Sequence, residues 1–254
     1  MNLGLKNKVA IVLGASKGLG KACAKALALE GSQVVIGSRD EKILKDTALE
    51  LEKETGSKIL AVSTDVTIPK DLENFVARTI KKFGRIDILV NNAGGPPAGK
   101  FESFGDRQWQ SAFETNLLSA IRLTRLVIPH MRLTGSGRII NLVSVAVKQP
   151  MDNLILSNSI RAGVVGMAKT LSQELATDNI TVNNIATGLF LTERIKQLYD
   201  TEEKMKKVIT NIPMGRLGNP EELAALVAFL ASEKASYITG ATIQIDGGLC
   251  RSLL

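Results

Sequence analysis

The strongest constraint on this chain is an alternation of short, largely apolar runs with helix-forming segments along its length. The runs are rich in β-branched residues, which is typical of strands buried on both faces of a parallel sheet. They occupy residues 8–13, 33–37, 58–63, 85–91, 138–144, 180–186 and 241–246. Helical segments are predicted between them at 19–30, 41–55, after Pro69, and at 106–133, 157–177, 192–210 and 221–231. We therefore predict an α/β fold, a Rossmann-like doubly wound parallel sheet of seven strands with helices on both faces.

The composition indicates a single globular domain without a nucleic-acid or membrane partner. The 254 residues are 44% apolar and 22% charged, without a composition break, a linker or a repeat, so we predict one domain over residues 1–254. The net charge is +7, but the basic residues are dispersed and only 4% of the side chains are aromatic. This favours solvated surface charge over a nucleic-acid partner. No apolar run approaches the roughly 18 residues of a membrane span, so no membrane partner is predicted.

Cysteine usage and the N-terminus bear on the compartment. The two cysteines, Cys23 and Cys250, lie far apart, which indicates a reducing environment and no disulfide framework. The first ten residues lack the apolar stretch and cleavage site of a signal peptide. We therefore expect a cytoplasmic protein. No cluster of His, Cys and Asp has the spacing of metal ligands, so no metal site is predicted.

A glycine-rich loop joins the first predicted strand to the first predicted helix. It reads GASKGLG over residues 14–20. Glycines in this place let the backbone approach a pyrophosphate, and the helix N-terminus supplies free N–H groups and a positive dipole end. A bare glycine pattern also fits a plain βα turn. Because strand, glycines and helix follow in the required order, we predict a dinucleotide site.

The end of the second strand bears on which nucleotide binds. An NAD site usually has an acidic residue there for the ribose 2′-hydroxyl. This chain has Arg39 at that point and Lys17 in the glycine loop, and two cations suit a 2′-phosphate. Asp40 is either a ribose ligand or the N-cap of the next helix. We predict NADP(H) rather than NAD(H).

Seven segments together resemble the short-chain dehydrogenase/reductase family, and most of all its 3-oxoacyl-acyl-carrier-protein reductase group. They are GASKGLG (14–20), Asp65-Val66, NNAG (91–94), Asn116, INLVS (140–144), ITVNNIATG (180–188) and the ending GRLGNPEELAALVAFLAS…YITGATIQIDGG (215–248). The resemblance covers nearly the whole chain. It implies the strand order 3-2-1-4-5-6-7, a homotetramer, a substrate lid at about 189–212, and NADP-dependent interconversion of a ketone and a secondary alcohol.

The resemblance also assigns roles to single residues. Ser144 would bind the substrate carbonyl oxygen, and Asn116 would hold a kinked helix and a water of the proton relay. Asn116 as a solvent-facing helix residue and Ser144 as a strand-end hydroxyl are the alternatives. Asp65 would accept a hydrogen bond from the adenine amino group. The predicted cofactor-binding set is Gly14, Ser16, Lys17, Gly18, Leu19, Gly20, Arg39, Asp65, Val66, Asn92, Ala93, Gly94, Arg161, Gly188, Phe190 and Thr192.

The chain departs from the family at its general acid. The family has a Tyr followed four residues later by a Lys, and this sequence has Ser157 and Arg161 there. An aliphatic hydroxyl is a far weaker acid than a phenol, and a guanidinium stays protonated. Arg161 can still fork onto ribose hydroxyls. We list Ser144, Asn116, Ser157 and Arg161 as catalytic positions, and Lys148 is the substitute proton donor closest to Ser144 in sequence.

Two functions from different classes follow. One is an NADP-dependent oxidoreductase whose acid–base chemistry is weakened or altered. The other is a catalytically silent NADP(H)-binding scaffold or redox sensor. The apolar residues of 223–230, of the strand at 241–245 and of the tail at 249–254 would be exposed on a monomer, which supports self-association.

Overall fold

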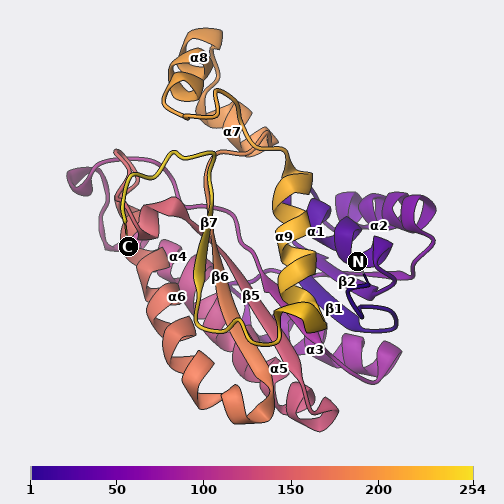
Figure 1. Ribbon diagram of the computed structural model, residues 1–254. Coiled ribbons are helices and arrows are strands. Elements are labelled where there is room, and N and C mark those ends of the chain that lie inside the picture. The colour runs from indigo at the N-terminus through magenta and orange to yellow at the C-terminus, as the bar shows by residue number, and fades with distance from the viewer. Residues whose placement is uncertain (1, 254) are drawn as a thin grey trace.

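The computed structural model describes residues 2–253 and contains a seven-stranded, all-parallel sheet in the order β3-β2-β1-β4-β5-β6-β7 (Figure 1). This confirms the predicted fold class and strand order. The strands are β1 Val9–Leu13, β2 Gln33–Ser38, β3 Ile59–Ser63, β4 Ile88–Asn91, β5 Gly137–Ser144, β6 Ile180–Thr187 and β7 Thr242–Ile245. The α-helices are α1 Gly18–Leu29, α2 Glu41–Thr55, α3 Pro69–Phe83, α4 Asp106–Phe113, α5 Ser119–Thr134, α6 Ile155–Glu174, α7 Glu193–Leu198, α8 Glu202–Thr210 and α9 Pro220–Ala231.

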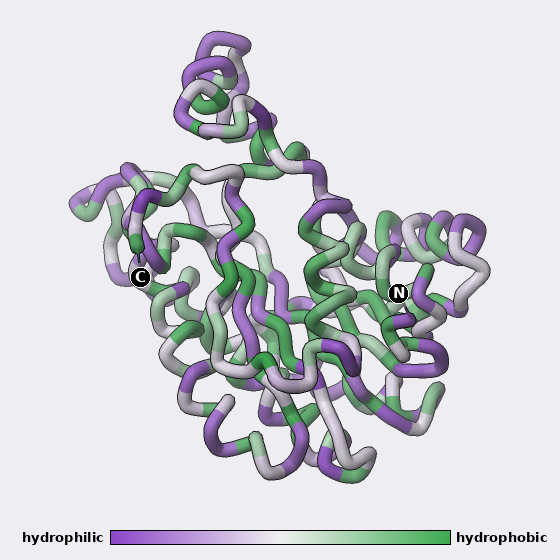
Figure 2. Tube along the Cα trace, in the orientation of Figure 1, coloured by the Kyte–Doolittle hydropathy of each residue, from purple (hydrophilic) through white to green (hydrophobic). Residues whose placement is uncertain are grey.

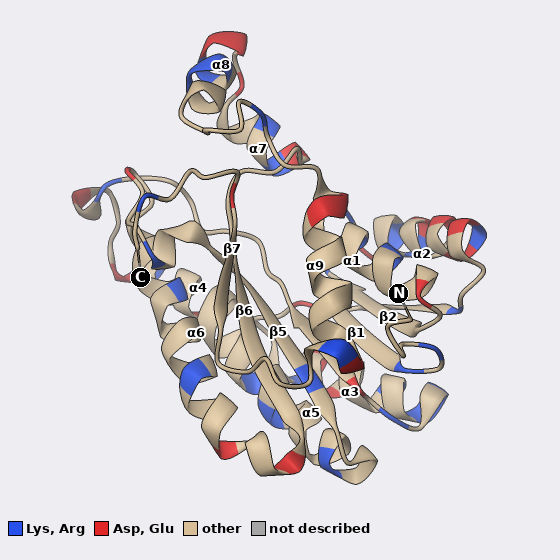
Figure 3. Cartoon of the chain, in the orientation of Figure 1, with Lys and Arg blue, Asp and Glu red and all other residues tan. Residues whose placement is uncertain are grey.

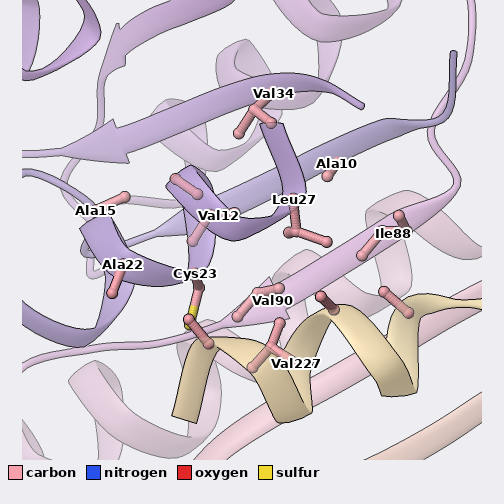
Figure 4. Close-up of a cluster of buried hydrophobic side chains, with 14 of the residues drawn as sticks. Ala10, Val12, Ala15, Ala22, Cys23, Leu27, Val34, Ile88, Val90 and Val227 are labelled. Carbon is pink, nitrogen blue, oxygen red and sulfur yellow. The ribbon is translucent and has the colours of Figure 1, made fainter. Parts of the chain in front are cut away.

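The sheet is sandwiched between two helical layers, each with its own apolar core. On one face, α1, α2 and α9 pack on the strands, and Figure 4 shows Cys23 and Leu27 of α1 beside Val227 of α9. On the other face, the core is formed with α3, α5 and α6. Every residue of β1 is buried, because this central strand is covered on both sides. From β1 the chain adds β2 and β3 on one side of the sheet and then returns to add β4 on the other side of β1. The point beside β1 where this direction changes is a topological switch point, and ligands bind at such points in doubly wound sheets.

Two predicted helices are divided in the structure. The segment predicted as one helix over 106–133 contains a π-helical turn, η2, over Glu114–Leu118 between α4 and α5. The segment 192–210 forms two helices, because Thr201 accepts a hydrogen bond from the Lys204 N–H and begins a new helix. In Figure 1 α7 and α8 extend beyond the carboxyl ends of the strands, and Figures 2 and 3 show how polar and charged this lobe is.

One expectation about exposed apolar surface is wrong. The apolar face of α9 is not exposed, because Leu223 and Leu230 are fully buried in the core that α9 shares with α1. The strand β7 pairs only with β6 and forms one edge of the sheet, where Ile243 and Ile245 are partly buried. Within residues 2–253, no helix is long and apolar enough to cross a membrane.

Candidate active site

The glycine loop is packed so tightly at Gly14 and Gly20 that a side chain at either position would clash. At Gly20 a Cβ would lie 2.3 Å from the carbonyl oxygen of Gly14, and at Gly14 it would lie 2.8 Å from Nδ2 of Asn92. That amide also donates to the carbonyl oxygens of Leu13 and Gly14, which ties the loop to the end of β4. Helix α1 begins at Gly18 and has no acidic residue in its first turn. The loop therefore has the shape and polarity that a pyrophosphate requires.

The two cations predicted near the adenine ribose are free to meet a phosphate. Asp40 is the N-cap of α2, one of the two roles that the sequence allowed, since its carboxylate accepts from the Ile43 N–H at 2.9 Å. Arg39 and Lys17 are exposed, and their side chains have no hydrogen-bond or ion-pair partner within residues 2–253. The hydroxyl of Ser38 is buried and, among the same residues, also unpartnered. The residues present here fit a 2′-phosphate.

The other nucleotide-binding candidates stand at the carboxyl ends of neighbouring strands. Asp65 follows β3, and one of its carboxylate oxygens accepts from the backbone N–H and the hydroxyl of Thr67. Its second oxygen has no partner in the described part of the chain. Thr192 lies over the glycine loop, since a Cβ on Gly18 would be 3.5 Å from its methyl carbon. Gly188 is required by packing, because a Cβ there would lie 2.6 Å from Cα of Asp246.

A cavity of about 520 Å³ runs from the glycine loop to the predicted catalytic positions. Its walls come from the loops after β1, β4, β5 and β6 and from α6 and α7. The sequence-predicted residues that line it are Gly14, Lys17, Gly18, Leu19, Asn92, Ala93, Gly94, Ser144, Ser157, Arg161, Gly188, Phe190 and Thr192. Ser16, Gly20, Arg39, Asp65, Val66 and Asn116 are not part of this lining. One cleft therefore joins the cofactor loop to most of the predicted site.

Ser144 is oriented by the backbone that follows it. It ends β5, and its Oγ accepts from the Ala146 N–H at 3.2 Å. Because this contact uses a lone pair, the hydroxyl proton remains available to a carbonyl oxygen in the cavity.

Ser157 and Arg161 lie one turn apart on α6 and both face the cavity. Ser157 is buried, and its hydroxyl makes no hydrogen bond to any residue in 2–253. Arg161 donates from Nη1 to the carbonyl oxygen of Leu142 at 2.9 Å. Burial, with a smaller contribution from the neighbouring Arg194, lowers the pKa of the Arg161 guanidinium to about 10. The guanidinium is therefore still charged at neutral pH.

A second, much smaller cavity lies behind Arg161. Its volume is about 20 Å³, and Asn91, Asn116 and Arg161 contribute to its lining. The Oδ1 atoms of Asn91 and Asn116 are buried and have no partner within residues 2–253. Asn116 belongs to the π-helical turn, and such turns are frequent at functional sites. The space and the two free acceptors suit a single water molecule.

The cavity wall also contains residues that were not identified from the sequence, and two of them, both from the lid segment, carry a guanidinium or a phenol. Arg194 and Tyr199 come from the lid segment, and both line the large cavity. Burial raises the pKa of the Tyr199 phenol. Their lid position alone gave no indication of which way they face. Lys148, predicted as a substitute proton donor, is not part of the lining.

The chain is similar to known oxidoreductases over almost its whole length. A family model described as enoyl-(acyl carrier protein) reductase matches residues 14–250. Dehydrogenase/reductase SDR family member 4 of Caenorhabditis elegans is 39% identical over 249 residues, covering 96% of this chain and 95% of that protein. The 3-oxoacyl-(acyl-carrier-protein) reductase FabG of Vibrio cholerae is 37% identical over 249 residues, covering 97% and 99%.

Solved structures give the same result. The crystal structure of L-sorbose reductase from Gluconobacter frateurii, complexed with NADPH and L-sorbose, superposes with a TM-score of 0.95 at 35% identity. The match covers 100% of both chains. The fold, the glycine loop and these similarities agree: the chain belongs to the short-chain dehydrogenase/reductase family.

Proposed function

We propose that this protein is an NADP(H)-dependent oxidoreductase that interconverts a ketone and a secondary alcohol, in the manner of the 3-oxoacyl-carrier-protein reductases but with altered acid–base chemistry. The observation that carries the proposal is the single cavity that joins the glycine loop to the Ser144 hydroxyl. The similarity to a reductase that binds NADPH supports the choice of cofactor. We propose residues 189–212 as the lid of a single cofactor-binding domain, in a cytoplasmic protein.

The residues of the chain then have distinct tasks. NADPH, when bound, supplies the hydride, and the glycine loop, Asp65 and the segment 92–94 hold its adenosine and phosphate groups. Ser144 donates a hydrogen bond from its hydroxyl to the substrate carbonyl oxygen and so fixes the position of that oxygen. Asn116 holds one water in the small cavity behind Arg161.

Reduction of the ketone also needs a proton for the alcohol oxygen, and the chain has no efficient general acid at position 157. A positioned general acid contributes roughly 10²–10⁴-fold to a rate, and Ser157 is a poor acid. In this proposal the proton therefore comes from water or from a group other than residue 157. Tyr199 lines the cavity with a phenol and is one such group. We expect NADPH to bind well while ordinary 3-oxoacyl substrates turn over slowly. The test is a panel of ketones and alcohols assayed with NADPH and NADP⁺ beside calorimetric titration of both cofactors.

A second function deserves the same test. The hydroxyl of Ser157 and the partly buried guanidinium of Arg161, in place of a phenol and an amine, favour a catalytically silent NADP(H)-binding scaffold or redox sensor. Tight NADPH binding without turnover of any member of the panel would support the silent protein. Turnover that depends on Ser144 would exclude it.

The substitution Arg39→Asp tests the nucleotide preference. A charge-assisted contact to the 2′-phosphate contributes roughly 1.5–3 kcal/mol. We expect Arg39→Asp to weaken NADPH binding by about ten- to a hundredfold, the affinity equivalent of that energy. Lys53→Asp, the same charge reversal near the far end of α2, is the control and is expected to leave the Kd unchanged. Equal binding of NADPH and NADH by the unmodified protein contradicts the preference.

Assembly can be tested separately. We expect a homotetramer with 222 symmetry, as the family resemblance implies. The open edge of β7 supports this, because exposed sheet edges are usually covered by another element or chain. Light scattering at micromolar concentration is expected to give four times the mass of the chain, and a monomer mass would reject the proposal.

A further inference from the structure

Two arginines meet at one point in the cavity wall, above the segment that follows β4. A Cβ placed on Gly95 would lie 3.7 Å from Nη2 of Arg194 and 4.0 Å from Nη2 of Arg161. Arg161 comes from α6 and Arg194 from the lid helix α7, so residues far apart in sequence place two guanidinium groups beside the same glycine.

Each guanidinium is fixed in place but keeps donors to spare. Arg194 donates from Nη2 to the carbonyl oxygen of Pro96 at 3.0 Å, and Arg161 donates from Nη1 to that of Leu142 at 2.9 Å. A guanidinium has five N–H donors in a rigid fork. These backbone contacts therefore anchor both side chains and leave most of their N–H groups without a protein acceptor.

The charge of the pair is not balanced by the protein. Neither arginine forms a salt bridge with any residue in 2–253, in contrast to Arg85, Arg122, Arg132 and Arg216. Two carboxylates line the same cavity. Glu193 is paired with Lys196 at 2.9 Å, and Asp152 is exposed and lies beyond salt-bridge distance of both arginines. Arg161 is partly buried and Arg194 is exposed. Two like charges side by side repel each other, and an anion bound between them relieves that repulsion.

We propose that Arg161 and Arg194 together bind the carboxylate of the substrate, which makes the substrate an oxo acid rather than a neutral ketone or thioester. This inference rests on the proposed function and adds the substrate class to it. Planar carboxylates match the guanidinium fork, and two forks beside Gly95 offer bidentate contacts. The pair and Ser144 line the same cavity. In the proposed complex one small oxo acid places its carboxylate on the arginines and its carbonyl at the serine hydroxyl.

The first experiment compares an acid with its ester on the unmodified protein. 3-Oxobutanoate and ethyl 3-oxobutanoate are titrated by calorimetry into protein saturated with NADP⁺, which cannot reduce either of them. We expect the acid to bind at least about tenfold more tightly than the ester, because only the acid carries the anion. Equal affinities overturn the proposal.

The second experiment removes one guanidinium and preserves the other. Arg194→Gln is expected to weaken binding of 3-oxobutanoate by about tenfold or more, to leave the ester unchanged, and to change the Kd of NADPH less than twofold. Arg194→Lys, which keeps the charge but loses the fork, is expected to recover part of the affinity. Lys207→Gln, an equal loss of charge on the exposed face of α8, is the matched control.

The outcomes distinguish two anions that the arginine pair could bind, a carboxylate of the substrate and a phosphate of the cofactor. If Arg194→Gln weakens NADPH and leaves the preference for the acid intact, the pair holds a phosphate of the cofactor and the substrate proposal is overturned. If the unmodified protein binds no NADPH, the proposed function fails, and the acid and the ester are then compared without nucleotide. In that case tighter binding of the acid still supports the anion site, and equal binding rejects it.

Discussion

The double substitution Ser157→Tyr with Arg161→Lys is expected to raise the rate of ketone reduction by about 10²-fold, because a positioned general acid contributes roughly 10²–10⁴-fold. Ser157 faces the 520 Å³ cavity, which gives a phenol ring room to enter. The ammonium introduced at 161 is one turn away on α6 and favours the ionised phenol, which lowers the pKa of that phenol. The measurement is NADPH oxidation with ethyl 3-oxobutanoate, a neutral ketone whose binding does not depend on the guanidinium of Arg161.

The control for this experiment keeps the ring and removes the acid. Ser157→Phe with Arg161→Lys fills the same space without a hydroxyl and is expected to show no gain. Calorimetric titration with NADPH establishes that each variant is folded and binds the cofactor. Vigorous reduction by the unmodified protein contradicts the prediction and directs attention to another proton donor, such as Tyr199. A double variant that binds NADPH but gains no activity favours the silent binding protein instead.

Gly20→Ala is expected to weaken NADPH binding by about a hundredfold or more. The added Cβ would lie 2.3 Å from the carbonyl oxygen of Gly14 and 2.8 Å from Nδ2 of Asn92, so the start of α1 must move away from the loop. Charge-assisted hydrogen bonds to the pyrophosphate contribute roughly 1.5–3 kcal/mol each, and the displacement breaks more than one of them. The same overpacking is expected to cost about 1–3 kcal/mol of stability.

Gly166→Ala is the matched control. It makes the same chemical change inside α6, where an added Cβ meets nothing within 4 Å. A glycine inside a helix is about 0.5–1 kcal/mol less favourable than alanine, so this variant is expected to be slightly more stable and to bind NADPH normally. NADPH binding by Gly20→Ala that equals that of the unmodified protein would show that the loop can relax without loss of the cofactor site.

The sequence determined the elements of this fold because they depend on local patterns. Uniform apolar runs such as residues 8–13 predicted buried strands, and β1 is buried throughout. The glycines of 14–20 predicted a loop whose backbone can approach a pyrophosphate, and in the structure a Cβ added at Gly20 would lie only 2.3 Å from the carbonyl oxygen of Gly14. The predicted ends of most helices agree with the structure to within two residues, because caps such as Asp40 act on their own turn.

Local sequence patterns do not predict features that depend on packing between distant segments. The apolar pattern of residues 106–133 reads as one continuous helix, and only the family resemblance implied a kink at Asn116, where the structure has a π-helical turn. The face of α9 was expected to be exposed, yet it is buried, because α1 lies beside it. No pattern in the sequence distinguishes a helix face that is buried within the chain from one that is buried by a second chain.

The candidate site likewise contains residues that the sequence predicts and one residue whose place depends on tertiary packing. Ser144, Ser157 and Arg161 were predicted from the sequence because the family resemblance aligns these positions, and all three line one cavity. The position of Arg194 beside Arg161 depends on where the lid helix α7 lies relative to the segment after β4, and the hydrogen bond to Pro96 that fixes it spans almost a hundred positions of the chain. Charge–charge interactions act through space, so only the tertiary structure decides which cations share one cavity and which anion that cavity can hold.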